Sequence, residues 1–296
     1  MCIRDSPRGR AGGGTVAPDV AGTPARAPCS MKNTIKLSSP ATQEFWEIPI
    51  LYEDAQVLAL DKPSGVPAVP DRAQPERPSL LRLLHDGIKR GAPWARAGDR
   101  SYLMATHRLD AETSGVMLLA KSKPVLIALL NHFGASQPGR RHVALVQGTP
   151  PEARFQIDTK LAPHPARAGL MCANARRGKR SVTLFEVREK FSGYTLLQCE
   201  PLTDRPHQIR AHLRVARLPV LGDPLYGGRE LRLSQLKPDY RLKPNQVERP
   251  LIARAAVHCE TLALPHPLTG EPLSITAPWP RQLAAAIKYL RKFAPA

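Results

Sequence analysis

One polar segment of the chain has residue types suited to acid–base or covalent catalysis. It spans residues 107–115 and leads directly into the apolar run 116–120. Loops held by a rigid sheet are where catalytic side chains concentrate, and a carboxylate flanked by His and Arg stays ionised when partly buried. Asp110 is therefore the candidate nucleophile. The alternative is an Asp that only caps the turn before a strand, with Thr113 and Ser114 as hydrogen-bond partners.

A second segment, residues 205–214, combines basic and apolar residues at helical spacing. Ile209 and Leu213 are four residues apart and should pack inward, whereas Arg210 and Arg214 form a basic row beside them. That row either meets phosphates or is a solvated helix face. Only Arg210 lies close enough to the apolar stripe to turn inward, and an inward Arg needs a carboxylate partner.

The elements that must position these residues indicate an α+β fold rich in strands. β-branched runs bounded by Pro and Gly predict strands, and Ser79 is a candidate cap for a helix through residues 80–88. Further helices are expected to begin near residues 123, 207 and 281, and the Pro-rich stretch 63–78 should be a loop. The predicted strands are residues 57–61, 115–120, 142–147, 182–190, 194–201, 255–264 and 273–277.

Composition restricts the class of protein. The formal net charge is +18, which favours a polyanionic partner such as nucleic acid over a generally charged surface. No apolar run approaches the roughly 18 residues that a membrane helix needs. The five cysteines include no Cys-x-x-Cys pair, which predicts neither a zinc site nor a disulfide framework and fits a reducing, cytoplasmic location.

The chain divides into three predicted parts. Residues 1–30 are rich in Gly, Ala, Pro and Arg, so they are expected to be disordered, and Met31 is a candidate native start. Residues 31–46 form a lead-in, which is too short for an S4 RNA-binding module. Residues 47–296 are predicted to be one catalytic domain.

Several motifs together resemble the RluA-like family of RNA pseudouridine synthases. The resemblance runs from about residue 47 to residue 280 and implies a central, mixed, mainly antiparallel sheet with an active-site cleft. It rests on Asp-Lys-Pro-Ser-Gly at 61–65, the segment 107–115, Gln-Ile-Arg at 208–210, Gly-Asp at 222–223, Tyr-Gly at 226–227 and His-Pro-Leu-Thr-Gly-Glu at 266–271.

The resemblance implies roles for three residues. Asp110 is expected to be the essential carboxylate, Arg210 its salt-bridge partner, and Arg108 the side chain that helps displace the target uridine from its stack. Asp110 either attacks the sugar at C1′ or removes a proton from C2′, and the sequence does not separate these routes. The expected substrate is structured RNA, either ribosomal or transfer RNA. No cofactor, metal or membrane is implied, and a monomer is expected.

Two positions depart from the family pattern. His142 occupies the place of a tyrosine that stacks on the uracil and is a candidate base for the C5 proton. An imidazole also stacks and titrates nearer neutrality, although packing alone is an equal interpretation. Asp204 stands where the family usually has Gly, and it either caps the following helix or competes with Asp110 for Arg210. The cap is the favoured interpretation.

The remaining candidates have weaker patterns. Leu202 and Ile209 resemble apolar positions that line the uracil pocket, although both are equally explained as core. His107 and Arg214 complete the expected RNA-binding set, together with a basic loop that either grips the RNA backbone or solubilises the surface. The loop residues are Arg176, Arg177, Lys179 and Arg180.

Two rival functions remain open at the level of sequence. One is a catalytically silent RNA-binding protein that keeps the same fold. The other is an N-glycosidase that cleaves the glycosidic bond without rejoining the base.

Overall fold

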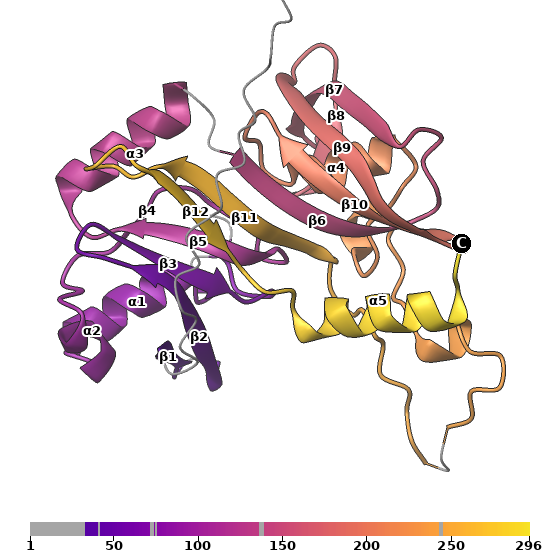
Figure 1. Ribbon diagram of the computed structural model, residues 1–296, viewed down its shortest axis with the longest axis horizontal. Helices are drawn as coiled ribbons and strands as arrows, with labels where there is room; N and C mark the ends of the chain where they lie inside the picture. The colour runs from indigo at the N-terminus through magenta and orange to yellow at the C-terminus, as the bar shows by residue number, and fades with distance from the viewer. Residues whose placement is uncertain (1–32, 41, 72–73, 75, 136–138, 243–244) are drawn as a thin grey trace, which may run out of the picture.

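One mixed sheet extends through the whole molecule and carries the candidate site (Figure 1). The computed structural model describes residues 33–40, 42–71, 74, 76–135, 139–242 and 245–296. The strands are β1 Thr34–Ser39, β2 Glu44–Glu53, β3 Val57–Lys62, β4 Met104–Ala105, β5 Ser114–Ala120, β6 Gly139–Gln147, β7 Arg154–Pro163, β8 Met171–Ala173, β9 Lys179–Phe191, β10 Tyr194–Pro201, β11 Val257–Pro265 and β12 Pro272–Thr276.

The sheet has 12 strands, with the order β1-β2-β3-β5-β11-β6-β10-β9-β7-β8. The short strand β4 adds to β5, and β12 adds to β11. β5 and β11 pair in parallel, and the other paired strands are antiparallel. The predicted α+β fold with a mixed, mainly antiparallel sheet is confirmed.

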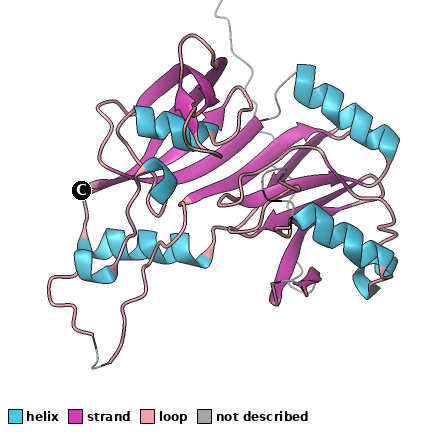
Figure 2. Cartoon of the chain, turned by 180° about the vertical axis from the view of Figure 1, so that it is seen from behind, coloured by secondary structure: helices cyan, strands magenta, loops and turns pink. Residues whose placement is uncertain are grey.

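Helices cover both faces of the sheet. In Figure 1, α3 lies above the sheet, whereas α1, α2 and α5 lie below it, and Figure 2 shows the same helices from behind. In Figure 1, α4 overlaps the strands β7–β10, against which it packs. Ser79 caps α1 as the sequence predicts, because its Oγ accepts a hydrogen bond from the Arg82 amide at 3.4 Å. The helices are α1 Leu80–Lys89, α2 Pro93–Ala97, α3 Lys123–Ala135, α4 Gln208–Val215 and α5 Arg281–Phe293, with 3₁₀ turns at Pro224–Tyr226 and Leu233–Gln235.

β5, the strand that follows the candidate catalytic segment, is buried on both faces. Met117 and Leu119 belong to the cluster that includes α1, whereas Val116 and Leu118 belong to the cluster that includes α3. Successive side chains of a strand point to opposite faces, so a strand covered on both sides must be apolar throughout. This burial explains the continuous apolar run after the polar loop and gives that loop a rigid base.

The other half of the sheet has its own core. Ile209 and Leu213 of α4 and Ile287 and Leu290 of α5 belong to one cluster with the buried residues of β6 and β10. The inward positions of Ile209 and Leu213 agree with the helical spacing in the sequence. The cluster fixes α4 against the strands beside which Arg210 lies.

The amino-terminal part of the described chain adds strands that the sequence analysis did not predict. The predicted lead-in, residues 31–46, includes β1 and the beginning of β2, and Ile35 and Leu37 are buried beneath α1. β7 was also not predicted. Residues 1–30 lie outside the described residues. Within the described residues, no helix has the length and apolar character needed to cross a bilayer.

Candidate active site

Asp110 lies in the turn that leads into β5. Its carbonyl oxygen accepts a hydrogen bond from the Thr113 amide at 3.1 Å, which closes the turn. Gly115, at the start of β5, has φ +113°, and a Cβ there would overlap the Cys259 carbonyl oxygen on β11. Only glycine tolerates both the backbone angle and the close approach. The glycine therefore lets β11 approach the end of the catalytic loop and hold it.

A second loop fixes the same turn from the other side. The Gly65 amide donates to the Ala111 carbonyl at 2.7 Å, and Ser64 Oγ donates to the Glu112 carbonyl at 2.7 Å. Lys62 Nζ, which is buried, donates to the Ala111 carbonyl at 3.3 Å and to two carbonyls of its own loop. Burial lowers the pKa of Lys62 to about 7. The sequence analysis assigned no role to Lys62, although the motif around it was recognised.

Arg210 joins two carboxylates. Its Nη1 lies 3.5 Å from Asp110 Oδ2, whereas Nε and Nη2 donate to the Asp223 carboxylate at 2.6 and 2.8 Å. Burial alone would lower the pKa of Arg210, but the hydrogen bonds and charge of Asp223 raise it, so the guanidinium stays charged. The expected contact between Asp110 and Arg210 is present, but the closer partner is Asp223, to which the sequence analysis gave no role.

The beginning of α4 also contacts Asp110. His207 has a left-handed backbone, with φ +52°, and its amide donates to Asp110 Oδ1 at 3.3 Å. Its Nδ1 lies 3.1 Å from Tyr226 Oη, and the Arg210 guanidinium lies over the Tyr226 ring at 5.0 Å from the centroid. One Asp110 oxygen thus contacts a backbone amide and the other faces a guanidinium.

Asp110 opens into a small cavity of about 50 Å³. The cavity collects side chains from the catalytic loop, β6, the end of β10, the loop before α4, α4 itself and β11. It brings together five residues of the predicted site: Arg108, Asp110, His142, Ile209 and Arg210. The other lining residues are Leu109, Thr113, Arg140, Pro201, Asp204, Arg205, Gln208 and Val257.

His142 lies on the β6 wall of the cavity and is 5% exposed. Burial lowers its pKa to about 3, and the nearby Arg140 charge acts in the same direction. The expectation of an imidazole that titrates near neutrality is therefore wrong. Nδ1 of His142 has no hydrogen-bond partner among the described residues. His142 thus presents a neutral ring whose buried Nδ1 is available for a hydrogen bond.

Asp204 has a different partner from either of those expected. Its Oδ2 accepts a hydrogen bond from Arg140 Nη1 at 3.0 Å. No side-chain cap is present at the start of α4, and Arg210 is bound by Asp223 instead. Both interpretations of Asp204, as a helix cap and as a rival for Arg210, are wrong because Arg140 reaches this carboxylate from β6.

Of the predicted residues that lie outside the cavity lining, His107 and Leu202 are the two that are not surface cations. His107 is 7% exposed, its Nε2 accepts from the Leu118 amide at 3.1 Å, and its ring stacks on Phe133. Burial lowers its pKa to about 3. Leu202 is 40% exposed and follows the end of β10 at Pro201, which itself lines the cavity. His107 therefore anchors the loop that carries Asp110 to β5 and α3, and Leu202 belongs to the surface.

The predicted basic residues are spread over the surface near the site. Arg108 is exposed at the cavity, and Arg214 is exposed on the next turn of α4 after Arg210. The connection between β8 and β9 includes Arg176 and Arg177, whereas Lys179 and Arg180, which were predicted to belong to the same loop, are the first residues of β9. Arg180 pairs with Asp158 at 2.8 Å, and all four basic side chains are exposed.

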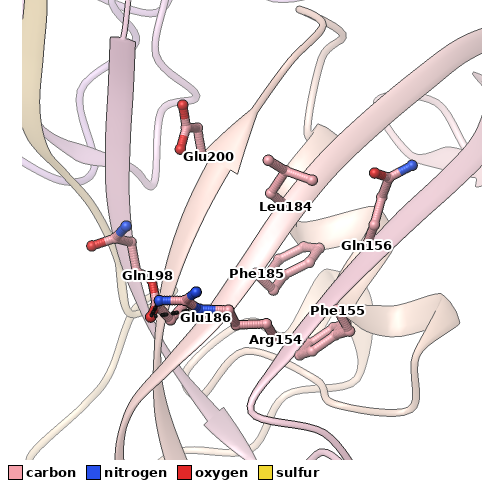
Figure 3. A pocket seen from close by; sticks show the side chains of 8 residues that line it. All are labelled: Arg154, Phe155, Gln156, Leu184, Phe185, Glu186, Gln198 and Glu200. Atoms are coloured by element: carbon pink, nitrogen blue, oxygen red, sulfur yellow. Dashed lines mark hydrogen bonds and ion pairs between the residues drawn. The ribbon is translucent and has the colours of Figure 1, made fainter. Parts of the chain in front are cut away.

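A larger hollow lies on β7, β9 and β10 (Figure 3), with a volume of about 420 Å³. Arg154 and Glu186 form an ion pair across it at 2.7 Å, and Leu184 is 36% exposed. It contains none of the predicted site residues, so we do not assign the chemistry to it. Among the described residues, no three His, Cys, Asp or Glu side chains are grouped as a metal site.

Comparisons with known proteins agree with this geometry. Residues 56–214 match the family model described as RNA pseudouridylate synthase. Ribosomal large subunit pseudouridine synthase D of Xanthomonas campestris pv. campestris is 36% identical over 244 residues, which covers 82% of this chain and 69% of that protein. Ribosomal large subunit pseudouridine synthase C of Escherichia coli (strain K12) is 32% identical over 248 residues, with 82% and 70% covered.

A solved structure shares the fold. Human RNA Pseudouridylate Synthase Domain Containing 4 has a TM-score of 0.59 and 22% identity, with 82% of this chain and 92% of that chain covered. At this identity the likeness supports the fold alone. The family match and the sequence relatives go further, and the matched range includes Asp110 and Arg210. The chain belongs to the RNA pseudouridylate synthase family and is an isomerase that acts on RNA.

Proposed function

We propose that this enzyme converts uridine to pseudouridine in the RNA of the large ribosomal subunit. The names of the relatives in Xanthomonas and Escherichia support this choice of RNA, and the net charge of +18 suits a polyanionic substrate. The observation that carries the proposal is the contact of Asp110 with Arg210 at a cavity in a chain of this family.

Asp110 is the proposed catalytic residue. Pseudouridine formation breaks the C–N glycosidic bond, turns the uracil while it is held, and joins its C5 to C1′ of the sugar. The two chemical routes are attack of the carboxylate on C1′ and removal of a proton from C2′. Both need an ionised, accessible carboxylate, and the Asp110 side chain is 16% exposed at the cavity.

Arg210 is the proposed positioning residue for Asp110. Two hydrogen bonds to Asp223 hold the guanidinium, so Arg210 Nη1 stays 3.5 Å from Asp110 Oδ2 and does not form a short, two-bond pair with it. A fixed positive charge at this distance stabilises the carboxylate while leaving its oxygens available to the sugar.

Access to the cavity requires the target base to leave its stack, which costs a few kcal/mol. Arg108 is exposed and lies within two residues of Asp110, so it is suited to fill the gap left in the RNA and to bind the displaced phosphate. Arg214 on α4, and Arg176 and Arg177 between β8 and β9, are further exposed cations that could contact RNA phosphates.

His142 is the proposed stacking partner for the uracil. With a pKa of about 3 its ring is neutral and accepts protons poorly near neutral pH, so we assign it to stacking rather than to transfer of the C5 proton. Ile209, which is 8% exposed, lines the same cavity and supplies apolar contact.

Mapping of pseudouridine in ribosomal RNA, with and without the gene, tests the proposal and identifies the target. Loss of one or more pseudouridines from large-subunit RNA is the expected result, and an unchanged map would contradict it. The mapped segment, transcribed with C5-tritiated uridine, then serves as the substrate for purified enzyme.

Wild-type enzyme should release tritium from this transcript, and Asp110→Asn should not. Glu112→Gln is the matched control, because it changes a carboxylate of the same loop that does not line the cavity. Free uracil among the products would indicate an N-glycosidase. If neither wild type nor Asp110→Asn releases tritium and both still bind RNA, the protein is a catalytically silent RNA-binding protein.

A further inference from the structure

An ion pair on the cavity wall has no role in the function proposed above. Arg140 of β6 is 4% exposed, and its Nη1 donates to Asp204 Oδ2 at 3.0 Å. Asp204 is 45% exposed, and both side chains line the cavity that holds Asp110. A buried guanidinium next to a half-exposed carboxylate therefore faces the space that the target base would enter.

Such a pair presents a hydrogen-bond donor beside an acceptor. The Watson–Crick edge of uracil has the complementary order, because its N3–H donates and the carbonyl oxygens on either side accept. Cytosine reverses this order, since its N3 accepts and its exocyclic amine donates. A carboxylate facing the cytosine N3 and a guanidinium facing its amine would both be repulsive.

The position of His142 fits a base oriented in this way. Residues 140 and 142 of β6 point to the same face of the strand, about 7 Å apart along it. His142 presents its neutral ring to the cavity, and its Nδ1 is buried without a partner. A pyrimidine stacked on this ring would direct one edge along β6 toward Arg140 and the carboxylate that Arg140 holds.

We propose that Asp204 and Arg140 select uracil over cytosine at the target position. The Asp204 carboxylate accepts the N3–H of the flipped base, and the Arg140 guanidinium donates to an adjacent carbonyl oxygen. The inference rests on the proposed function, because it assumes that the base enters beside Asp110. It adds the two side chains that read the base, whereas Asp110 and Arg210 serve the sugar chemistry.

Affinity for RNA tests the proposal independently of turnover when it is measured in Asp110→Asn protein, which should leave the uridine unconverted. The probe is the mapped transcript segment with uridine, cytidine or N3-methyluridine at the target position, and dissociation constants are measured by fluorescence anisotropy. A good two-bond contact to a base edge discriminates by roughly 5- to 150-fold. Asp110→Asn protein, the parent for the variants below, should therefore bind the uridine RNA more tightly than both others by a factor in this range.

In Asp204→Ala the preference for uridine should fall to within about threefold of unity, while affinity for the cytidine RNA is kept or improved. Asp204→Asn leaves Arg140 an oxygen to bond, so it provides a folded variant should the alanine form unfold. Its amide offers either an acceptor or a donor to the base, and the preference should again shrink. Asp158→Ala, which breaks an exposed Arg–Asp pair at 2.8 Å, is the matched control and should keep the wild-type preference.

An unchanged preference in folded Asp204→Ala and Asp204→Asn would overturn the inference. So would equal binding of the three RNAs by the Asp110→Asn parent, when wild-type enzyme releases tritium from the transcript. Failure of the proposed function gives a different result, namely no tritium release from wild-type enzyme with any segment of ribosomal RNA.

Discussion

Replacement of Asp223 by Asn should destabilise the fold and impair catalysis together. Asp223 is 1% exposed and Arg210 is 4% exposed, and two short hydrogen bonds join them. Removing one partner from a buried pair costs about 3–5 kcal/mol, because the other charge stays buried without compensation. Asn keeps the shape and one acceptor, so we expect a loss near the lower limit, about 3 kcal/mol.

The same replacement should change the environment of the carboxylate. Without the negative charge of Asp223, Arg210 has Asp110 as its remaining acidic partner, now 3.5 Å away. A shorter and stronger pair would mask the Asp110 oxygens from the sugar. We therefore expect kcat to fall at least tenfold, which corresponds to about 1.4 kcal/mol in the barrier, with a smaller change in KM.

Urea unfolding followed by circular dichroism, and tritium release under saturating RNA, measure the two effects. Asp158→Asn removes the charge from an ion pair of similar length on the surface and should leave the urea midpoint nearly unchanged. The reasoning is refuted if Asp223→Asn costs less than about 1 kcal/mol at an unchanged denaturant slope, or keeps the wild-type kcat.

Four further outcomes are expected. Gly115→Ala should lower the free energy of unfolding by more than about 1 kcal/mol in urea titrations, because its Cβ would collide with the Cys259 carbonyl. Lys62→Met should lower kcat at least tenfold in tritium-release assays, since the Ala111 carbonyl keeps only the Gly65 amide as a donor and the carbonyls of Lys62's own loop lose the ammonium. The rate should be flat with respect to His142 from about pH 5.5 to 8, because its pKa of about 3 keeps it neutral there. The pKa of His142 is about 6.5 in the unfolded chain and about 3 in the folded protein. Between these two pH values His142 is protonated only in the unfolded chain, so acidification should lower the free energy of unfolding by about 5 kcal/mol. Unfolding of His142→Phe should depend less on pH in this interval, and equal slopes would contradict the assignment.

Elements with a local signal were predictable from the sequence. Ser79 and the apolar spacing after it predict α1 because a helix cap depends on residues three apart. The predicted strand 194–201 has the bounds of β10. β7 was missed because Phe155 and Ile157 are only partly buried, and what covers them is decided by tertiary packing.

The candidate site was predictable in its main residues but not in its partners. Asp110 and Arg210 lie in motifs whose residue types suggest their chemistry. Asp223 lies 13 residues beyond Arg210, and Asp204 meets Arg140 across 64 residues, so neither pair has a local pattern. The low pKa of His142 was equally inaccessible, because it arises from burial that only the folded sheet creates.

The place of β11 in the sheet sets the order in which the molecule is completed. Cys259 of β11 pairs with Gly115 on one side and with His142 on the other. Among the described strands, β11 provides the ladder that joins β1–β5 to β6–β10. A nascent chain emerges from the ribosome amino terminus first, so the residues of both half-sheets are synthesised before the strand that connects them. A chain interrupted before residue 257 would carry Asp110 and His142 without holding them in register, and activity would arise only near the end of translation.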